Sequence, residues 1–273
     1  MKIAAIDLDG TLLRTDCTIS DYSKDIITKA CKSGIMVVPT SGRSFRNIKE
    51  QIQDIEGIQY CISGNGSVVT ELKTESVIYN HKIPEKIAYD IYREVREQGG
   101  FIEIYSDNDA YVEKEVGHIL YETSLSEEFC ESLLSTDIPI LSANLLLKRG
   151  LMRVNKYHIA FSDPQVMNKF SKECEENQGL IVTHPTIYNM EVFASGCNKD
   201  MGIRVLCKKY GIDRKDIIAM GDSDNDVAMV QYAQLGCAVD NSMDILKNAA
   251  DRIIGSNDED GPAHMLEEMM QTM

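Results

Sequence analysis

The chain has 273 residues, of which 43% are hydrophobic and 26% are charged, so it is long enough to bury the core of one large domain or of two unequal domains. This composition excludes collagen-like and low-complexity chains. With 28 Lys and Arg residues against 43 Asp and Glu residues the net charge is −15, which argues against nucleic acid and anionic membrane surfaces as partners.

The eight cysteines are scattered and form no Cys-x-x-Cys pair, so we expect reduced thiols rather than zinc ligands. The apolar run over residues 3–6 is too short for the core of a signal peptide. We also find no run of about 18 uncharged apolar residues, the minimum for a membrane helix. These features predict a cytoplasmic protein without a membrane segment, and they leave its oligomeric state open.

Three apolar strands are predicted near the N-terminus, over residues 3–6, 35–38 and 60–62. The first is continuously apolar, which is typical of a strand buried on both faces of a parallel sheet. A helix should begin after Ser20 and end near Gly34, and an amphipathic helix should follow the second strand. Strands that alternate with helices in this way predict a doubly wound, Rossmann-like α/β core, whose ligands bind beyond the carboxyl ends of the strands.

The middle of the chain has a different pattern. A long helix is predicted over residues 84–98 and a strand over 101–105, and the same order recurs as a helix over 164–177 and a strand over 180–182. Two helix-then-strand units predict a smaller α+β domain inserted into the core. The expected core is formed by residues 1–82 and 191–273, and the expected insertion by residues 83–190.

Acidic residues follow two of the apolar strands of the predicted core. Asp7 and Asp9 come after the first strand, and Asp222 and Asp226 come after an apolar strand over 217–220. Carboxylates gathered in one cleft repel one another unless a cation neutralises them, and oxygen ligands of this kind suit Mg²⁺. The structural alternatives are an Asx turn for the first pair and a helix-capping cluster for the second.

The order of motifs resembles that of phosphatases of the haloacid dehalogenase superfamily. The matching residues are Asp7-x-Asp9-Gly10-Thr11, Ser41-Gly42-Arg43, Lys199 and Gly221-Asp222-x-x-Asn225-Asp226. The pairs Asn65-Gly66 and Asp260-Gly261 are similar to the Cof-type branch, in which an α/β cap is inserted between the second and third motifs. The resemblance therefore implies that residues 83–190 form a cap that selects the substrate.

The resemblance also implies a role for each motif residue. Asp7 would be the nucleophile that forms an aspartyl-phosphate, and Asp9 would act as general acid and then as general base. Mg²⁺ would be held by the side chain of Asp7, the main-chain carbonyl of Asp9 and Asp222, with Asp226 as a further ligand or just behind the ligands. The residues implied to bind phosphate and substrate are Ser41, Gly42, Arg43, Lys199 and Asn225.

The function implied is the Mg²⁺-dependent hydrolysis of phosphate monoesters of small metabolites, with sugar phosphates as the first candidates. Two alternatives stay open: a sugar phosphomutase with similar motifs and, in another class, a non-enzymatic phospho-acceptor or metabolite-binding regulatory protein. Asp9 argues against the regulatory protein, because a positioned general base shortens the life of an acyl phosphate. In the cap, Tyr111 and Tyr188 are candidates for contact with the substrate, although packing inside the cap is the more common role for such tyrosines.

Overall fold

The computed structural model describes residues 1–271, which separate into two compact units. Unit 1 contains residues 1–79 and the chain from residue 198 onward, and unit 2 contains residues 80–197. Each unit has its own sheet and its own apolar clusters. Within residues 1–271, no helix combines the length and the apolar composition that crossing a membrane would require.

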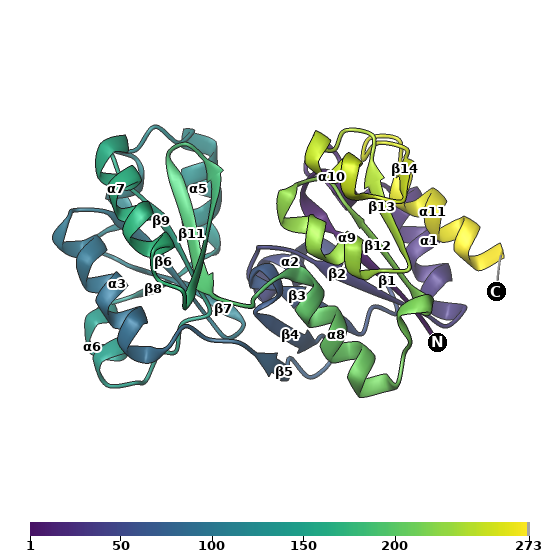
Figure 1. The fold of residues 1–273 in the computed structure, drawn as a ribbon, viewed down its shortest axis with the longest axis horizontal. Coiled ribbons are helices and arrows are strands. Elements are labelled where there is room, and N and C mark those ends of the chain that lie inside the picture. Colours follow the sequence, from purple (N-terminus) through teal and green to yellow (C-terminus); the bar gives the residue numbers. More distant parts are fainter. Residues whose placement is uncertain (272–273) are drawn as a thin grey trace. The chain divides into compact units, whose positions relative to one another are not determined.

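Unit 1 is built on an eight-stranded sheet with the order β14-β13-β12-β1-β2-β3-β4-β5 (Figure 1). All neighbours from β14 to β3 pair in parallel, whereas β4 pairs antiparallel with β3. The strands are β1 (Lys2–Asp7), β2 (Ile35–Thr40), β3 (Tyr60–Ser63), β4 (Val68–Glu71), β5 (Val77–Asn80), β12 (Ile217–Gly221), β13 (Leu235–Val239) and β14 (Arg252–Ile254). The helices are α1 (Asp21–Lys32), α2 (Phe45–Ile52), α8 (Lys199–Tyr210), α9 (Val227–Tyr232), α10 (Asp244–Ala249) and α11 (Gly261–Gln271).

The continuous apolar sequence of β1 is explained by helices on both faces of the sheet. Ala4 and Ile6 pack in one cluster with α1, α2 and α11. Ile3 and Ala5 point to the other face and pack with α8, α9 and α10. The predicted doubly wound α/β core is therefore confirmed, and α1 begins as expected after Ser20, whose side chain accepts a hydrogen bond from the Ser23 N–H.

The position of β1 decides where a ligand can bind. The chain proceeds from β1 to β2 on one side, and β12 pairs with β1 on its other side, so the order of strands reverses at β1. In doubly wound folds the loops after the carboxyl ends of the strands diverge at such a point and leave a crevice. The residues that follow β1, β2 and β12 therefore come together at one edge of the sheet.

Unit 2 contains a six-stranded mixed sheet with the order β10-β11-β9-β6-β7-β8. Its neighbours pair antiparallel except β7 and β8, which pair in parallel. The strands are β6 (Phe101–Ser106), β7 (Asp109–Glu113), β8 (Ile138–Ile140), β9 (Lys156–Ala160), β10 (Leu180–Thr186) and β11 (Asn189–Ala194). The helices are α3 (Glu85–Glu97), α4 (Gly117–Leu120), α5 (Glu127–Thr136), α6 (Ala143–Lys148) and α7 (Pro164–Glu175).

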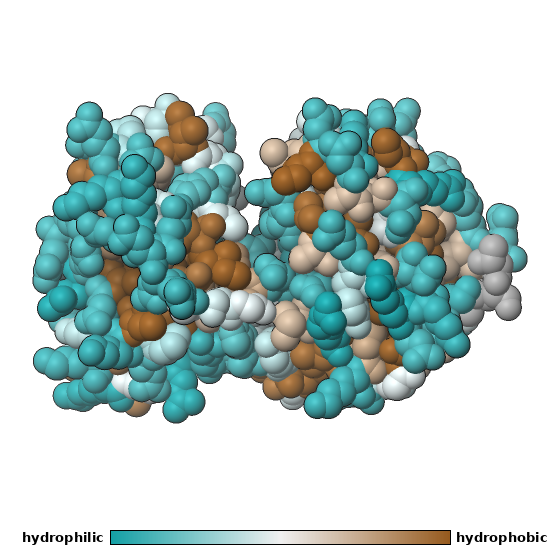
Figure 2. Space-filling model, in the orientation of Figure 1, coloured by the Kyte–Doolittle hydropathy of each residue, from teal (hydrophilic) through white to brown (hydrophobic). Residues whose placement is uncertain are grey.

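The two faces of the unit 2 sheet differ in chemistry. One face is apolar and packs with α3, α6 and α7. The opposite face packs with α4 and α5 through Phe101 and Val112, but it also holds buried polar residues. Glu103 and His158 pair there, with His158 Nδ1 3.1 Å from Glu103 Oε2. On the face of the molecule drawn in Figure 2, hydrophilic side chains cover most of each unit and smaller apolar patches lie between them.

The limits of the two units differ from the expected domain boundaries. Residues 191–194, expected in the core, belong to β11, which pairs with β9 and β10 in the sheet of unit 2. Asn80, also expected in the core, is hydrogen-bonded to Asn155 of unit 2. The physical reason is that β11 completes a sheet whose other strands were not all predicted, so its partner strands could not be assigned.

We predict that Gly202→Ala destabilises the protein, although alanine normally stabilises a helix interior by about 1 kcal/mol relative to glycine. A Cβ at this position of α8 would lie 2.6–2.7 Å from three side-chain atoms of Ile62 in β3. Such overpacking costs roughly 1–3 kcal/mol. Urea unfolding should show the loss, and Gly202→Ala should cost much less when Ile62→Ala, itself destabilising, is already present. A Gly202→Ala variant more stable than wild type would contradict the close packing of α8 on β3.

Candidate active site

The motif residues of unit 1 converge at the carboxyl edge of its sheet. Asp7 is the last residue of β1, Ser41 follows β2, and Asp222 follows β12. Lys199 is the first residue of α8. This helix packs, with α9 and α10, on the face of the sheet to which Ile3 and Ala5 point. Residues from four distant parts of the sequence thus form one site.

Three carboxylates form a compact cluster in this site. Asp7, Asp222 and Asp226 each offer an oxygen, and these oxygens all lie within 4.8 Å of one another. The Lys199 ammonium is 2.6 Å from Asp7 Oδ1 and 2.6 Å from Asp226 Oδ1. The Lys199 side chain is only 1% exposed, so its charge is compensated by these carboxylates rather than by water.

The buried charges shift the pKa values of the cluster. Burial, together with the negative charges of Asp226 and Asp222, raises the pKa of Asp7 well above its usual range, although Lys199 opposes the shift. Burial and Asp226 raise the pKa of Asp222 to about 6. Burial disfavours the ammonium of Lys199, yet the adjacent carboxylates raise its pKa above the ordinary value. The cluster therefore carries more negative charge than its own lysine can neutralise.

This imbalance provides a test of whether a divalent cation fits the site. When all three carboxylates are ionised, they and the one ammonium leave two negative charges uncompensated, and a divalent cation supplies two positive charges. The ligands are hard carboxylate oxygens, which Mg²⁺ prefers. The chemistry of the donor set therefore fits Mg²⁺.

The loop after β1 also fits closely against Asp222. Gly10 adopts a φ of 74°, and a Cβ there would lie 2.6 Å from Asp222 Oδ2. Only glycine meets both requirements. Thr11, to which we assigned no role, donates from its hydroxyl to Asp222 Oδ1 at 3.2 Å. Its place in the Asp-x-Asp-Gly-Thr motif is the sequence signal that could have indicated this contact.

Asp226 organises the second acidic loop. Its Oδ2 atom accepts hydrogen bonds from the main-chain N–H groups of Asp222 at 3.0 Å and Ser223 at 3.2 Å. Its Oδ1 atom faces Lys199. Both oxygens are therefore engaged in holding the loop and the lysine.

Asp9 lies outside the carboxylate cluster. Its side chain is 54% exposed, and its two oxygens accept hydrogen bonds from Arg43, from Nε at 2.9 Å and from Nη2 at 2.5 Å. Arg43, expected to bind phosphate, thus forms a bidentate pair with the expected acid–base residue. The structure brings the two residues together, but it leaves their roles as predictions.

The remaining motif residues surround Lys199 and the loop after β2. Asn225 Oδ1 accepts hydrogen bonds from Lys199 Nζ at 3.0 Å and from the Ser223 hydroxyl at 2.8 Å. Ser41 is buried, and its hydroxyl oxygen accepts from the Arg43 N–H at 3.2 Å. Gly42 lies so close to Asn65 that a Cβ would be 2.8 Å from Asn65 Oδ1.

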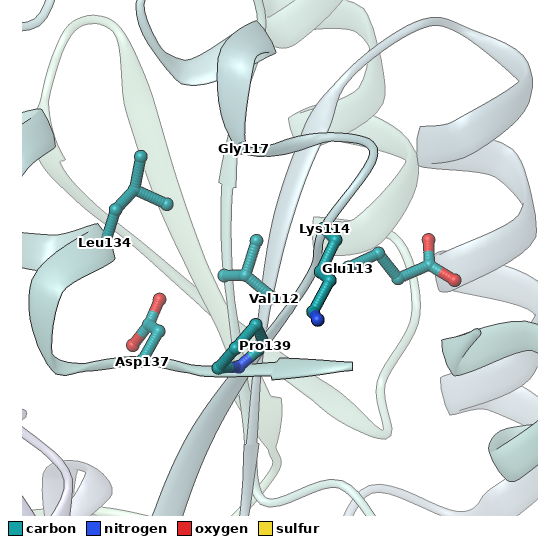
Figure 3. A pocket seen from close by; sticks show the side chains of 7 residues that line it. All are labelled: Val112, Glu113, Lys114, Gly117, Leu134, Asp137 and Pro139. Atoms are coloured by element: carbon teal, nitrogen blue, oxygen red, sulfur yellow. The ribbon is translucent and has the colours of Figure 1, made fainter. Parts of the chain in front are cut away.

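A separate cavity of about 260 Å³ lies in unit 2 between β7, β8, α4 and α5 (Figure 3). The residues that line it are Val112, Glu113, Lys114, Gly117, Leu134, Asp137 and Pro139. Burial and the nearby charge of Glu103 raise the pKa of Asp137 to about 9. The cavity contains none of the clustered aspartates.

The two tyrosines named as candidates for contact with the substrate lie in different parts of unit 2. Tyr111, in β7, is half-buried and packs against the apolar cluster beneath α3 and α7. Tyr188 is half-buried in the turn between β10 and β11, where its N–H donates to the Thr186 hydroxyl at 3.1 Å. The packing of Tyr111 agrees with a structural role. Tyr188 lies in the turn at the end of a hairpin, so its position leaves contact with a substrate as a prediction.

Comparison with known proteins gives consistent matches along the whole chain. A family model described as haloacid dehalogenase-like hydrolase matches residues 4–266. Phosphatase YwpJ of Bacillus subtilis is 26% identical, with 99% of this chain and 100% of the relative covered. The 5-amino-6-(5-phospho-D-ribitylamino)uracil phosphatase YcsE of the same organism is 29% identical, with 96% and 93% covered.

A solved structure agrees with these sequence matches. The haloacid dehalogenase-like hydrolase from Bacteroides thetaiotaomicron superposes with a TM-score of 0.81 at 26% identity, and the match covers 98% of this chain and 99% of that chain. The expected family is therefore confirmed by sequence and by fold. The chain belongs to the haloacid dehalogenase-like hydrolases and is a phosphoric monoester hydrolase of that family.

Proposed function

We propose that this protein hydrolyses phosphate monoesters of small metabolites with the help of Mg²⁺, and that phosphorylated sugars or polyols are its substrates. The observation that carries the proposal is the cluster of Asp7, Asp222 and Asp226, in which Asp7 and Asp226 pair with the buried Lys199. A dianionic phosphate needs charge neutralisation and in-line placement, and a divalent cation held by these carboxylates would provide the first together with Lys199. The name of YcsE, a phosphatase of a phosphoribityl compound, supports the substrate class.

In the proposed mechanism Asp7 is the nucleophile. One of its carboxylate oxygens forms a bond to phosphorus while the bond between phosphorus and the ester oxygen breaks, and Asp9 gives its proton to the leaving oxygen. Asp9 then removes a proton from water, which attacks the phosphorus of the aspartyl-phosphate and releases inorganic phosphate with Asp7 restored. A carboxylate nucleophile in this way divides one displacement into two easier steps.

The other residues of the site would position the phosphate. The Ser41 hydroxyl and the Gly42 N–H would donate to its oxygens, and Lys199 would neutralise them while Asn225 holds the ammonium in place. The Arg43 guanidinium donates hydrogen bonds to Asp9 in this structure. We infer that Arg43 donates to the phosphate of a bound ester instead, which would leave the Asp9 carboxyl group available for proton transfer.

Asp7, Asp222 and the main-chain carbonyl of Asp9 would hold Mg²⁺. Both oxygens of Asp226 already have hydrogen-bond partners, which favours a position just behind the ligands. When bound, the cation neutralises the carboxylates and polarises the phosphoryl group.

We further propose that unit 1 is the catalytic core and unit 2 the cap that selects the substrate. The clustered aspartates, Lys199 and the loops at the strand ends all belong to unit 1, so the chemistry can be assigned without unit 2. A bare sheet edge cannot by itself enclose an ester and discriminate between leaving groups.

We expect Asp7→Asn to abolish turnover without unfolding the chain, because the amide has nearly the same shape but is no anionic nucleophile. Phosphate release from a panel of sugar and polyol phosphates measures the loss, and circular dichroism checks the fold. Asp9→Asn should slow both chemical steps, by about 100-fold or more. Wild-type activity in Asp7→Asn, at matched purity, would refute the proposed nucleophile.

Activity should disappear in excess chelator and return with Mg²⁺, and Asp222→Asn should not respond to the metal. The variant also allows a test on the metal-free protein. Because the pKa of Asp222 is raised to about 6 in the folded state, its carboxylate destabilises the metal-free fold increasingly as pH rises from about 4 to 6. Asp222→Asn should therefore gain about 1–2 kcal/mol of unfolding free energy at pH 7.5 and almost nothing at pH 4.

Urea unfolding in chelator at pH 7.5 and pH 4 measures whether Asp222→Asn raises the free energy of unfolding at the higher pH only. The metal should then stabilise the wild type more than it stabilises Asp222→Asn. Full activity in chelator, or equal stabilisation of both proteins by Mg²⁺, would eliminate Asp222 as a metal ligand.

Substitutions in unit 2 should change the choice of substrate more than the chemistry. We expect Tyr188→Ala to alter the ranking of natural phosphate esters while hydrolysis of a small aryl phosphate stays within about threefold, since the core performs the same reaction on both. Tyr111→Ala is the second candidate. Tyr89→Ala is the control for Tyr188→Ala, because Tyr89 lies in α3 and its hydroxyl donates to Asn144 Oδ1 within unit 2. An unchanged ranking in both candidate variants would place specificity elsewhere.

A further inference from the structure

The loop between β3 and β4 has an unusual backbone. Gly64, Asn65 and Gly66 are three successive left-handed residues, with φ values of 55°, 55° and 96°. Two are glycines, for which this conformation costs little, and asparagine tolerates it better than most other residues. Asn65 is also only 3% exposed, so its side chain points into the protein rather than into solvent.

Main-chain hydrogen bonds attach this loop to the residues that follow β2. The Gly64 N–H donates to the Arg43 carbonyl at 3.0 Å, and the Asn65 N–H donates to the Ser41 carbonyl at 3.1 Å. The Asn65 side chain then fills the space beside Gly42, where a Cβ would lie 2.8 Å from Asn65 Oδ1. The loop therefore fixes the backbone that is proposed to bind phosphate.

The same loop packs against the start of α8. A Cβ on Gly66 would lie 2.0 Å from the Asn198 carbonyl oxygen and 2.9 Å from the Lys199 nitrogen, so the two backbones are in direct contact. This contact places the first residue of the helix, Lys199, next to Asn65.

The side chain of Asn65 reaches the third loop of the site. Its Oδ1 atom accepts a hydrogen bond from Asn225 Nδ2 at 3.5 Å. The other end of the Asn225 amide, Oδ1, accepts from Lys199 Nζ at 3.0 Å, and Nζ is 2.6 Å from Asp7 Oδ1. Asn65, Asn225, Lys199 and Asp7 thus form a continuous chain of polar contacts.

The direction of the Asn225 amide decides whether this chain works. An ammonium group can only donate, so Lys199 needs the oxygen of Asn225 and is repelled by its NH₂ group. Asn65 Oδ1 can only accept, so it selects the orientation in which Asn225 turns its NH₂ toward Asn65 and its oxygen toward Lys199. The Ser223 hydroxyl, which donates to Asn225 Oδ1 at 2.8 Å, favours the same orientation from the oxygen end of the amide. Without Asn65 Oδ1 the NH₂ end loses this acceptor, and the amide oxygen is no longer held against the ammonium from both ends.

We propose that Asn65 is a positioning residue for phosphoryl transfer, which orients Asn225 so that Asn225 holds Lys199 against the nucleophile Asp7. This inference rests on the proposed phosphatase function. It adds a residue that touches neither phosphate nor metal and acts on the reaction through the amide of Asn225.

The test separates the side chain of Asn65 from its backbone. Asn65→Gly keeps the left-handed conformation but removes the acceptor, whereas Asn65→Asp keeps an acceptor oxygen. We expect kcat to fall about tenfold or more in Asn65→Gly with KM nearly unchanged, because misplacement of a catalytic group affects the chemical step. Asn65→Asp adds a carboxyl group to an acidic site, so kcat should fall in this variant as well, but less than in Asn65→Gly. Glu75→Gly is the control, since Glu75 is another left-handed residue of unit 1, in an exposed turn.

A double-mutant cycle tests the route through Asn225. If Asn65 acts through that amide, Asn65→Gly should lower kcat by less than about twofold when Asn225→Ala is already present. If the fold-losses in kcat of Asn65→Gly and Asn225→Ala multiply in the double variant, the two residues act independently and the proposal is overturned. A wild-type kcat in Asn65→Gly would also overturn it. If Asn65→Gly fails to fold, a folded Asn65→Asp with a loss as large as that of Asn225→Ala would overturn it too.

Wild type and Asp7→Asn are measured beside these variants on the same esters. An inactive wild type would overturn the proposed function and this inference with it. An active wild type and an inactive Asp7→Asn, combined with full activity in Asn65→Gly, would overturn the role of Asn65 alone.

Discussion

The site depends on the buried ion pairs that the Lys199 ammonium forms with Asp7 and Asp226. A buried ion pair is costly to break from one side, because the remaining charge is left without water or a partner. Lys199 occupies the first position of α8, so the start of that helix, the end of β1 and the loop after β12 must meet with ångström accuracy. The close approach of Gly66 to Asn198 serves this requirement.

The doubly wound topology explains why such a concentration of charge is tolerated. The strands β1 and β12 are apolar and covered on both faces, and their burial stabilises the sheet over its whole length. The carboxylates stand only at the strand ends, where the loops diverge. The repulsion among them is therefore confined to the place where the proposed cation would relieve it.

Much of unit 1 could be predicted from the sequence, and the reason is local. Residues 3–6 and 217–220 are continuous apolar runs that end in acidic residues, so the strand, its burial and the position of the site follow from one pattern. Unit 2 was harder to predict, because β9 carries Lys156 and His158 on a face that is polar and yet buried, a pattern that also fits an exposed strand or a loop. Asn65 was noted only for its resemblance to the Cof-type branch and was given no role, since its partner Asn225 lies 160 residues away and only the folded loops bring them together.

Asp7 and Asp9 show how environment separates two identical side chains two residues apart. Asp7 is almost fully buried and held by Lys199, which suits a nucleophile that must stay aligned and be shielded from water. Asp9 is half-exposed and held by a partner that is itself partly exposed, which suits a group that must reach a leaving oxygen and afterwards a water molecule. The left-handed Gly10 turns the chain directly after Asp9, so Thr11 returns to Asp222 while Asp9 stays outside the cluster. The backbone of this short loop thus gives the two carboxylates different partners, and the division of labour proposed for them follows from that difference.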